Sequence, residues 1–274
     1  MNRVKAEAIS LAAPAVLLVV ALFVLPLGRI FWLSVSEPVL GLQNYAPLVA
    51  DYGVHKILLT TFRVCLLTSV ICVILGYVVA YAIVHASARM RDLMFFLILV
   101  PLWVSGLVRA FAWLMVLRRD GLANSAAQWL GLASEPLPIS YNEFAVLVGM
   151  VHYMLPYAIL PIYANMRDID HQLVRAARGL GASPARAFRR VFLPLSAPGT
   201  LAAASLVFIM SLGFYVMPLL LSGGRVTMIA EFIAVNVLDT ANWGVASMLA
   251  VVLLVTVLTL YALSRRVVKI GRVV

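Results

Sequence analysis

Long apolar runs alternate with shorter polar segments along this chain, and each run is long enough to cross a lipid bilayer. An α-helix needs about 20 apolar residues to span the hydrocarbon core of a membrane. Runs of that length lie at about 10–33, 58–84, 93–117, 144–165, 199–221 and 243–263. The pattern therefore predicts an all-α, polytopic membrane protein whose six transmembrane helices form one domain over residues 1–274.

The first apolar run is compatible in principle with a signal peptide as well as a span. The apolar core of a signal peptide is about 7–15 residues long and is followed by a small-residue cleavage site. Here the run continues to Val35. We therefore expect an uncleaved first span.

Basic residues concentrate in alternate connecting segments, which predicts the orientation. If the N-terminus is cytoplasmic, so are residues 1–9, 85–92, 166–198 and 264–274, and these hold 14 of the 21 Lys and Arg residues. Cytoplasmic loops of membrane proteins collect Lys and Arg. We therefore expect both termini in the cytoplasm.

Composition narrows the function classes. The chain is 64% hydrophobic and 12% charged, with a net charge of +10. No basic patch is interleaved with exposed aromatic residues, so we expect no nucleic-acid partner. Cys65 and Cys72 are seven residues apart on one predicted helix, which favours packing over a disulfide. No metal-ligand spacing and no GxxxxGK[ST] phosphate loop occurs, so we expect no metal, and no ATP bound by that route.

The segments on the outer side mix Gly, Pro, Asn, acids and aromatic residues. They cover residues 36–56, 118–142 and 222–242. The second and third have amphipathic centres, near 126–132 and 228–238. Short helices at the membrane surface, or dipping into it, suit these centres.

The longest cytoplasmic segment has strong start and stop signals for two short helices. Asp168 and Asp170 favour a helix start, and the glycines of 179–181 end that helix near Arg178. Ser183 and Pro184 then start a second helix, with apolar Phe188, Val191 and Phe192 opposite Arg186, Arg189 and Arg190. Pro194 and Pro198 are expected to break the path into the fifth span.

Two interpretations of this segment stay open from its residues alone. Its charge suits a basic loop held against anionic lipid headgroups. Its tight turn and fixed break points suit a shaped knob that docks into a groove of a partner protein. On the second interpretation, the apolar face and the Gly181 turn are what the partner grips.

The segment resembles the cytoplasmic loop of membrane subunits of ATP-binding-cassette (ABC) importers. That loop carries Glu-Ala-Ala, three residues, Gly, nine residues, then a β-branched residue, any residue, Leu and Pro. Here Ala176-Ala177 is followed by three residues, Gly181, nine residues and then Val191-Phe192-Leu193-Pro194. The family's Glu position holds Arg175, so the contact made by that carboxylate in relatives is in doubt here.

The resemblance implies a type I (MetI-like) permease fold in a bacterial inner membrane, without catalysis by this chain. It implies as partners two ATPase subunits carrying ATP and Mg, a second homologous permease, an extracytoplasmic solute-binding protein and the lipid bilayer. It also makes 168–194 the ATPase-coupling segment. The coupling residues implied are Arg175, Ala176, Ala177, Gly181, Ala182, Ser183, Phe188, Val191, Leu193 and Pro194.

Over most of the chain the resemblance is to the spermidine/putrescine permease branch, in more diffuse apolar patterns. The segments are GLQNYAPL at 41–48, LGYVVAYAI at 75–83, the stretch 101–124, and the stretches 208–224 and 242–254. The implied solute is a polyamine. Another small solute (an amino-acid derivative, an opine, an organophosphonate or a metal ion) stays open.

Residues of the solute path are predicted from intramembrane charge, aromatic faces and helix breaks. Arg109 lies inside the third span, where a charge marks function by default; it either lines the path, where an unpaired arginine would repel a cation, or snorkels outward or pairs with an acid. His152 is expected to be a hydrogen-bonded core residue, and Arg63 a snorkelling anchor. Gly213 and Pro218 in the fifth span, like Pro156 and Pro161 in the fourth, are expected to disturb their helices. The path candidates are Trp103, Arg109, Trp113, Glu143, Tyr153, Phe214, Tyr215, Glu231 and Asp239.

Two other classes fit the sequence less well. A lipid-modifying membrane enzyme would need clustered His, Asp or Glu at the membrane face, whereas the four histidines are widely separated. An ion-coupled carrier working alone would need no docking knob and usually shows acids at the centres of its spans, where this sequence has none.

Overall fold

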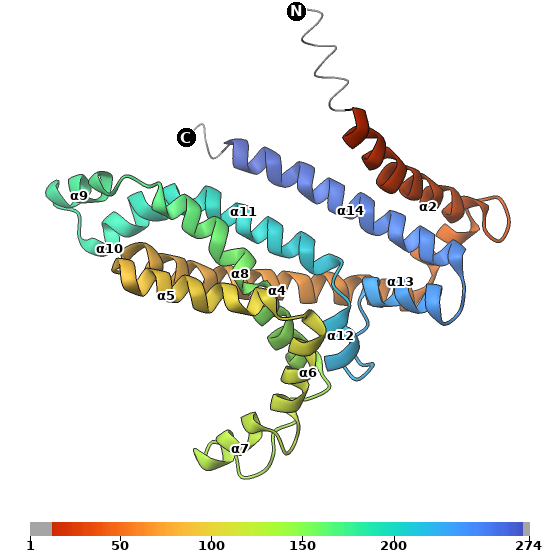
Figure 1. The fold of residues 1–274 in the computed structure, drawn as a ribbon, viewed down its shortest axis with the longest axis horizontal. Helices are drawn as coiled ribbons and strands as arrows, with labels where there is room; N and C mark the ends of the chain where they lie inside the picture. Colours follow the sequence, from red (N-terminus) through yellow and green to blue (C-terminus); the bar gives the residue numbers. More distant parts are fainter. Residues whose placement is uncertain (1–12, 271–274) are drawn as a thin grey trace, which may run out of the picture. The chain divides into compact units, whose positions relative to one another are not determined.

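The computed structural model describes residues 13–270, and from residue 263 onward its backbone alone. The basic residues predicted at 1–9 and 264–274, and the first three residues of the first predicted span, lie outside the side chains described. Within the described residues the secondary structure is helical (Figure 1).

The elements follow one another along the chain as α-helices joined by short 3-10 and π-type segments, labelled η. They are η1 (Val20–Val24), α2 (Leu25–Ser36), η2 (Gln43–Tyr45), α3 (Pro47–Ala50), α4 (Tyr52–His85), α5 (Ala88–Leu99), η3 (Val100–Trp103), α6 (Gly106–Leu117), α7 (Leu122–Trp129), α8 (Glu143–Arg167), α9 (His171–Gly179), α10 (Pro184–Ala187), η4 (Phe188–Phe192), α11 (Leu193–Leu212), α12 (Val216–Leu221), α13 (Ile229–Leu238) and α14 (Trp243–Ile270).

Five helices in the described part of the chain are long and apolar enough to span a membrane. They are Ala13–Ser36, Tyr52–His85, Glu143–Arg167, Pro184–Leu212 and Trp243–Ala262. A bent pair, Ala88–Trp103 with Gly106–Trp129, raises the number to six if it counts as one span.

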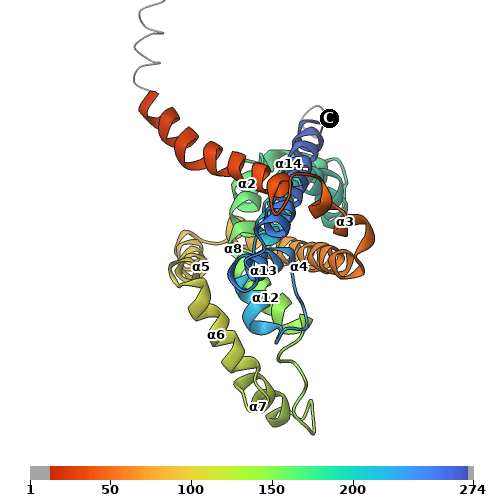
Figure 2. The same cartoon turned by 90° about the vertical axis from the view of Figure 1, so that its right-hand side faces the viewer.

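The third predicted span is broken. Its two halves meet at an angle of 101°, and Figures 1 and 2 both show α6 and α7 turning away from the direction of α5. Pro101 offers no N–H to a helix, and Val104 has extended backbone, so the helix ends there and α6 starts after Ser105. The sequence analysis did not anticipate this bend.

The path into the fifth predicted span differs from expectation at its start. The predicted break at Pro194 and Pro198 is wrong, because Pro184–Leu212 is one continuous helix. The π-type turn η4 precedes Pro194, which occupies the first turn of α11. Irregular turns of this kind let a helix absorb a proline.

Further along, the fifth span breaks where Gly213 predicted it. Helix α11 ends at Leu212, and α12 begins at Val216. Pro218 lies inside α12, and α8 continues through Pro156 and Pro161 without interruption.

Contacts divide the chain into two compact units. One holds residues 1–55 with 232–255, and the other holds residues 56–231 with 256–274. In the first, buried Asn44 donates its side-chain amide to the backbone oxygens of Ser34 and Glu37, at 3.0 and 2.6 Å. This clamp fixes the chain as it leaves α2, and it gives the GLQNYAPL segment a structural role.

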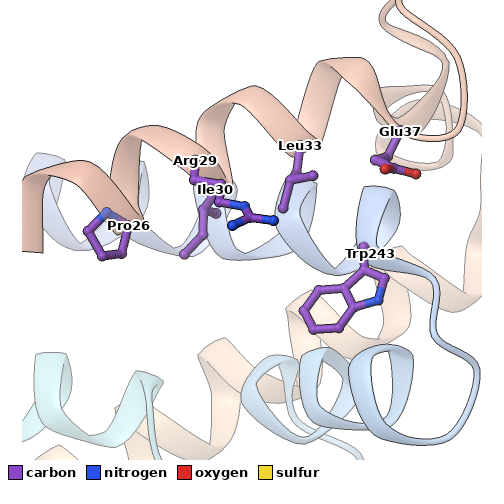
Figure 3. Close-up of a pocket in the computed structure, with 6 residues that line it drawn as sticks. All are labelled: Pro26, Arg29, Ile30, Leu33, Glu37 and Trp243. Carbon is purple, nitrogen blue, oxygen red and sulfur yellow. The ribbon is translucent and has the colours of Figure 1, made fainter. Parts of the chain in front are cut away.

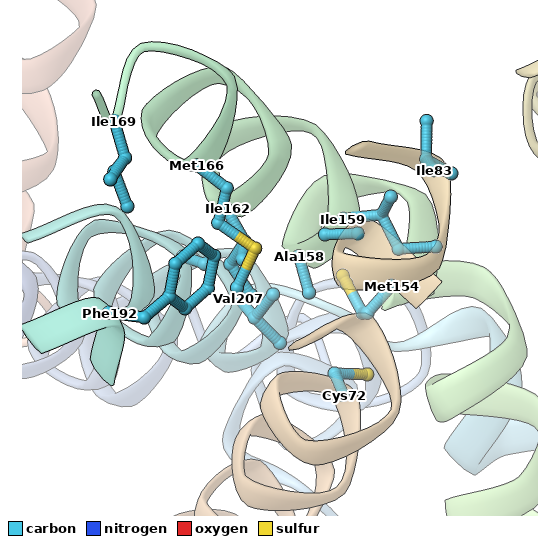
Figure 4. Packing of buried hydrophobic residues seen from close by; sticks show 12 residues of the cluster. Cys72, Ile83, Met154, Ala158, Ile159, Ile162, Met166, Ile169, Phe192 and Val207 are labelled. Carbon is cyan, nitrogen blue, oxygen red and sulfur yellow. The ribbon is translucent and has the colours of Figure 1, made fainter. Parts of the chain in front are cut away.

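In the larger unit, α8 packs along α11 and beside α4. The core includes Met154, Ile159 and Ile162 from α8, with Cys72 from α4 and Val207 from α11 (Figure 4). Cys65 and Cys72 are both buried free thiols, which confirms the packing interpretation.

Small residues let these helices approach closely, as is common in membrane proteins. A Cβ on Gly76 would lie 3.1 Å from the Ala158 side chain, and one on Gly199 would lie 2.4 Å from that of Asn165. The Gly199 N–H donates to Asn165 Oδ1 at 3.3 Å. The result is a rigid frame of α4, α8 and α11 that carries the loop at residues 168–194 at one end.

Candidate functional site

The first helix of the 168–194 loop, α9, has a cap at each end. The Asp170 side chain accepts the Gln172 N–H at 2.8 Å. At the other end, the N–H groups of Gly181 and Ala182 donate to the carbonyls of Arg178 and Ala177, at 3.0 and 3.1 Å. This is the Schellman arrangement, and Gly181 supports it with a φ of +89° that glycine adopts readily.

The second helix begins at the predicted cap. Ser183 Oγ accepts the Arg186 N–H at 3.4 Å, and Pro184 occupies the first turn. From there the chain runs through η4 into α11 without interruption. The loop therefore consists of three parts. They are the short helix α9, a turn at Gly181 that we call the glycine corner, and a second helix that continues into a span.

The aromatic face of the second helix points into the protein's own core. Phe192 is buried, and Phe188 is half-buried. Their rings lie 5.4 and 5.7 Å from the ring of Tyr81 on α4, edge to face. The expectation that a partner grips this face is therefore wrong for Phe192, which α4 covers, whereas the half-buried Phe188 keeps part of its side chain accessible.

Further side-chain contacts beside the Tyr81 ring hold α9 and α11 against the end of α4. The His85 and His171 rings are 5.6 Å apart, and the Tyr77 hydroxyl lies 2.8 Å from Ser196 Oγ. Sequence reasoning missed Tyr77, Tyr81 and His85. Their four-residue spacing along one helix face, opposite a loop with two phenylalanines, was the available signal.

What the loop does expose is a shallow groove beside the glycine corner, which we call the loop groove. Its volume is about 300 Å³. Leu180 is 90% exposed at its edge. The residues that line it are Ala177, Leu180, Gly181, Ala182, Arg186, Ala187, Arg190 and Val191.

The other predicted coupling residues lie around this groove in different environments. Arg175 and Ala176 are exposed on α9, and Leu193 and Pro194 are exposed at the start of α11. Ser183 serves as the helix cap. The structure thus places apolar surface and two arginines together at the corner, with Arg175 on the neighbouring helix.

Among the path candidates, Arg109 is brought together with Tyr153. Arg109 lies in the first turn of α6, and its guanidinium carbon is 3.9 Å from the centroid of the Tyr153 ring on α8. The Tyr153 ring in turn contacts Phe214, at 4.5 Å between centroids, in the break between α11 and α12. The arginine is buried, so the snorkelling interpretation is wrong.

Trp113 and His152 form a second pair between α6 and α8. The indole N–H of Trp113 donates to His152 Nδ1 at 3.1 Å. His152 is therefore the hydrogen-bonded core residue that the sequence predicted.

The predicted acids are in three different situations. Glu143 forms an ion pair with Arg63, which is a partner that the sequence analysis did not propose. Asp239 is exposed at the end of α13. Glu231 is 6% exposed in the first turn of α13, and its Oε2 has no hydrogen-bond partner within the described residues.

Burial raises the pKa of the Glu231 carboxyl above its ordinary value of 4.5, and a backbone hydrogen bond at Met228 partly opposes the shift. Of the remaining candidates, Trp103 is 90% exposed and Tyr215 is 43% exposed. The structure therefore does not bring all nine candidates into one site.

The smaller unit holds a cavity that sequence reasoning missed. It has a volume of about 590 Å³ between α2 and the start of α14 (Figure 3). Arg29, Glu37 and Trp243 line it together with Pro26, Ile30 and Leu33. Trp243 is far from Arg29 and Glu37 in the sequence, and no motif marked the three residues.

Comparison with known proteins identifies the family. The family model described as "Binding-protein-dependent transport system inner membrane component" matches residues 72–269 of the chain. The chain belongs to this family.

Relatives and solved structures agree with the family assignment. The spermidine/putrescine transport system permease protein PotB of Salmonella typhimurium (strain SL1344) is 32% identical over 210 residues, covering 77% of this chain and 73% of that protein. PotB of Escherichia coli (strain K12) is 31% identical, covering 77% and 76%.

A solved structure shows the same fold. It is a chain in the crystal structure of a bacterial alginate ABC transporter in complex with an alginate pentasaccharide-bound periplasmic protein, with a TM-score of 0.78, 17% identity, and coverage of 97% of this chain and 96% of that one. The predicted all-α, type I ABC importer permease fold is thereby confirmed.

The family match takes in the loop and all nine path candidates, since it begins within α4 and ends within α14. The loop motif was therefore a reliable indicator of the family.

Within the described residues, no three His, Cys, Asp or Glu side chains lie close enough together to hold a metal ion.

Proposed function

We propose that the chain forms half of the translocation pathway of an ATP-driven, binding-protein-dependent importer. A second homologous permease forms the other half, two ATPase subunits bind ATP and Mg and hydrolyse the ATP, and an extracytoplasmic binding protein delivers the solute. This chain performs no covalent chemistry. The observation that carries the proposal is the loop groove, exposed beside a rigid glycine corner and joined directly to a span.

The loop is built to pass force from a docked ATPase to the spans. Its second helix continues into α11, so a push on the corner displaces that helix as a rod. The contacts of Phe188 and Phe192 with Tyr81 carry the same push into α4. Closure of the ATPases would thus rock α4 and α11 together, which is the alternating-access motion.

The loop groove suits an acidic and apolar partner surface. Leu180 offers an exposed apolar side chain, and Arg186 and Arg190 offer two cations. Arg175 adds a third positive charge on α9. We therefore expect a carboxylate on the ATPase opposite Arg175.

We further propose that the solute is a small organic amine of the polyamine type. The relatives named for spermidine and putrescine transport support this class. So does Glu231, because a buried carboxylate with an unpaired oxygen is stabilised by an ammonium group.

Both termini face the cytoplasm in this proposal, as the distribution of basic residues predicts.

The docking role is tested by replacing Gly181 with valine. A β-branched residue cannot easily adopt a φ of +89°, so the corner should lose its shape while the spans stay folded. We expect Gly181→Val to abolish solute-stimulated ATP hydrolysis in the reconstituted transporter, with the protein still present in the membrane.

Gly179→Ala is the matched control. It lies two residues away, a Cβ there meets nothing within 4 Å, and its backbone is helical. We expect near-normal stimulation. Normal assembly and normal stimulation in Gly181→Val would show that the corner does not dock the ATPase.

A further inference from the structure

Arg109 is a buried cation that forms no ion pair within the described part of the chain. Its residue exposure is 6%, and its Nε and Nη1 atoms have no hydrogen-bond partner within the described residues. Of the three acids that could have paired with Arg109 (Glu143, Glu231 and Asp239), Glu143 is paired with Arg63 instead. The Tyr153 ring face contacts the guanidinium but accepts no conventional hydrogen bond from these nitrogens.

The backbone around Arg109 adds to the positive potential. Arg109 occupies the first turn of α6, where the helix dipole presents its positive end. A cation is unfavourable at that end of a helix. Buried donors left unpaired also destabilise the protein, more so when they carry charge. Both effects are removed by an anionic acceptor at Nε and Nη1.

The position of Arg109 is suited to a transported ligand. It lies just after the bend between η3 and α6, and the Tyr153 ring links it to Phe214 in the break between α11 and α12. Broken helices of transporters commonly line the solute path. Both broken segments thus contact the Tyr153 ring, one through the Arg109 guanidinium and the other through Phe214, and such aromatic faces also attract ammonium groups.

We propose that Arg109 is a carboxylate-binding site for the transported solute, so that the solute is an amine that also carries a carboxylate. This rests on the proposed function for the amine and adds the acidic group. Nε and Nη1 of Arg109 donate to the carboxylate oxygens, and the Tyr153 and Phe214 rings cover the apolar stem. A guanidinium is matched in geometry to a carboxylate.

Within the described residues, two buried charged side chains of the larger unit have atoms without a hydrogen-bond partner, and they are opposite in sign. Glu231 lacks a partner for one oxygen, and Arg109 lacks partners for two nitrogens. A solute with only ammonium groups would satisfy the glutamate and leave the arginine unpaired. A solute with both groups satisfies each in its own place.

Ornithine and putrescine test the proposal, since they differ only by one carboxylate. Uptake of each is measured with the complete transporter, binding protein included, in liposomes. We expect Arg109→Gln to lower ornithine uptake about tenfold or more relative to putrescine. Comparing the two solutes in wild type and variant cancels the preference of the binding protein.

Arg63→Gln is the matched control, because Arg63 is another arginine of the same unit, with a 60% exposed side chain that is already paired. It should leave the ratio unchanged. If Arg109→Gln does not assemble, Arg109→Lys carries the same comparison. It keeps the charge and loses the planar fork, so a smaller shift of the ratio in the same direction is expected.

Equal loss of both solutes in the Arg109 variant would overturn the inference, because Arg109 would then not distinguish a solute that has a carboxylate from one that lacks it. Uptake of putrescine but not ornithine by the wild type would overturn it and leave the amine assignment intact. Uptake of neither would overturn the amine assignment, and the inference with it.

Discussion

At the scale of single residues, Glu231 is the acid whose behaviour should be visible in transport. Because its pKa is raised by burial, this carboxyl becomes protonated at a higher pH than an ordinary glutamate. Protonation removes the charge that would hold an ammonium group under the proposed function. Uptake of amine solutes should therefore be present at neutral pH and be lost as the pH falls through the raised pKa.

The measurement is initial uptake against external pH. Glu231→Gln should lower uptake at neutral pH by about tenfold or more and flatten the pH profile. Asp239→Asn, at an exposed position at the end of the same helix, should keep the wild-type profile. An unchanged profile in Glu231→Gln would assign the pH dependence to another group.

Gly199 carries a second prediction at this scale, one about stability. A Cβ there would lie 2.4 Å from the Asn165 Cβ, so α8 and α11 would have to separate. Gly199→Ala should destabilise the protein by about 1–3 kcal/mol and lower the thermal midpoint of the purified protein. Gly28→Ala, where a Cβ meets nothing within 4 Å, is the control and should leave the midpoint unchanged.

Sequence reasoning was reliable for residues whose role is local. The Ser183 cap, the Gly181 turn and the hydrogen-bonded His152 were predicted because the first two depend on neighbours in the chain and the third on the cost of burying a polar ring. The interaction partners of Glu143 and Arg109 were not predicted. Their partners depend on which helix lies opposite, and the pairing of Glu143 with Arg63 joins residues 80 positions apart.

At the scale of elements, the aromatic contact between η4 and α4 allows two proposed roles of the loop to be tested separately. One is binding of the ATPase, and the other is passing its motion on to α4. Tyr81 contacts both Phe188 and Phe192, and none of the three lines the loop groove. Tyr81→Ala should therefore leave the ATPase docked while weakening the link to α4. We expect solute uptake per ATP hydrolysed to fall several-fold, with normal co-purification of the ATPase.

Tyr81→Phe keeps the ring and its edge-to-face contacts, so it should preserve the ratio of uptake to hydrolysis. Loss of ATPase binding in Tyr81→Ala would instead show that the ring contacts of Tyr81 with Phe188 and Phe192 shape the docking surface itself.

Element positions followed from the apolar pattern, but the breaks and joins within them did not. A run of apolar residues looks the same whether its helix is straight or bent by 101°. Pro194 was expected to break a helix and instead lies in a continuous one, because the π-type turn before it absorbs the irregularity. Hydrophobic periodicity does not report such adjustments of backbone hydrogen bonding.

At the scale of the whole molecule, the orientation of the chain is the prediction most open to direct test. Cys65 and Cys72 are both buried, so labelling of the native thiols by a membrane-impermeant reagent should be low. Leu180→Cys, at a position 90% exposed in the loop, should be labelled from the cytoplasmic side only. Trp129→Cys, at a position 86% exposed on α7, should be labelled from the outer side only.

Labelling of both introduced cysteines from the same side would contradict the predicted topology.

The fold class and the family followed from the sequence because six long apolar runs and the spaced motif of the cytoplasmic loop are sufficient for both. The division of the chain into two compact units did not follow, since it depends on contacts between the segments 1–55 and 232–255, which lie at opposite ends of the chain.

The uninterrupted helix Pro184–Leu212 has a consequence for how this protein can change over evolutionary time. Its 29 residues connect the glycine corner of the loop to the break beside Phe214. One residue added or removed inside it would rotate everything beyond by about 100° and shift it by about 1.5 Å. The corner and Phe214 would then face the wrong neighbours. An insertion or deletion inside this helix would therefore change the contacts at one of its ends, which a substitution that keeps its length does not do.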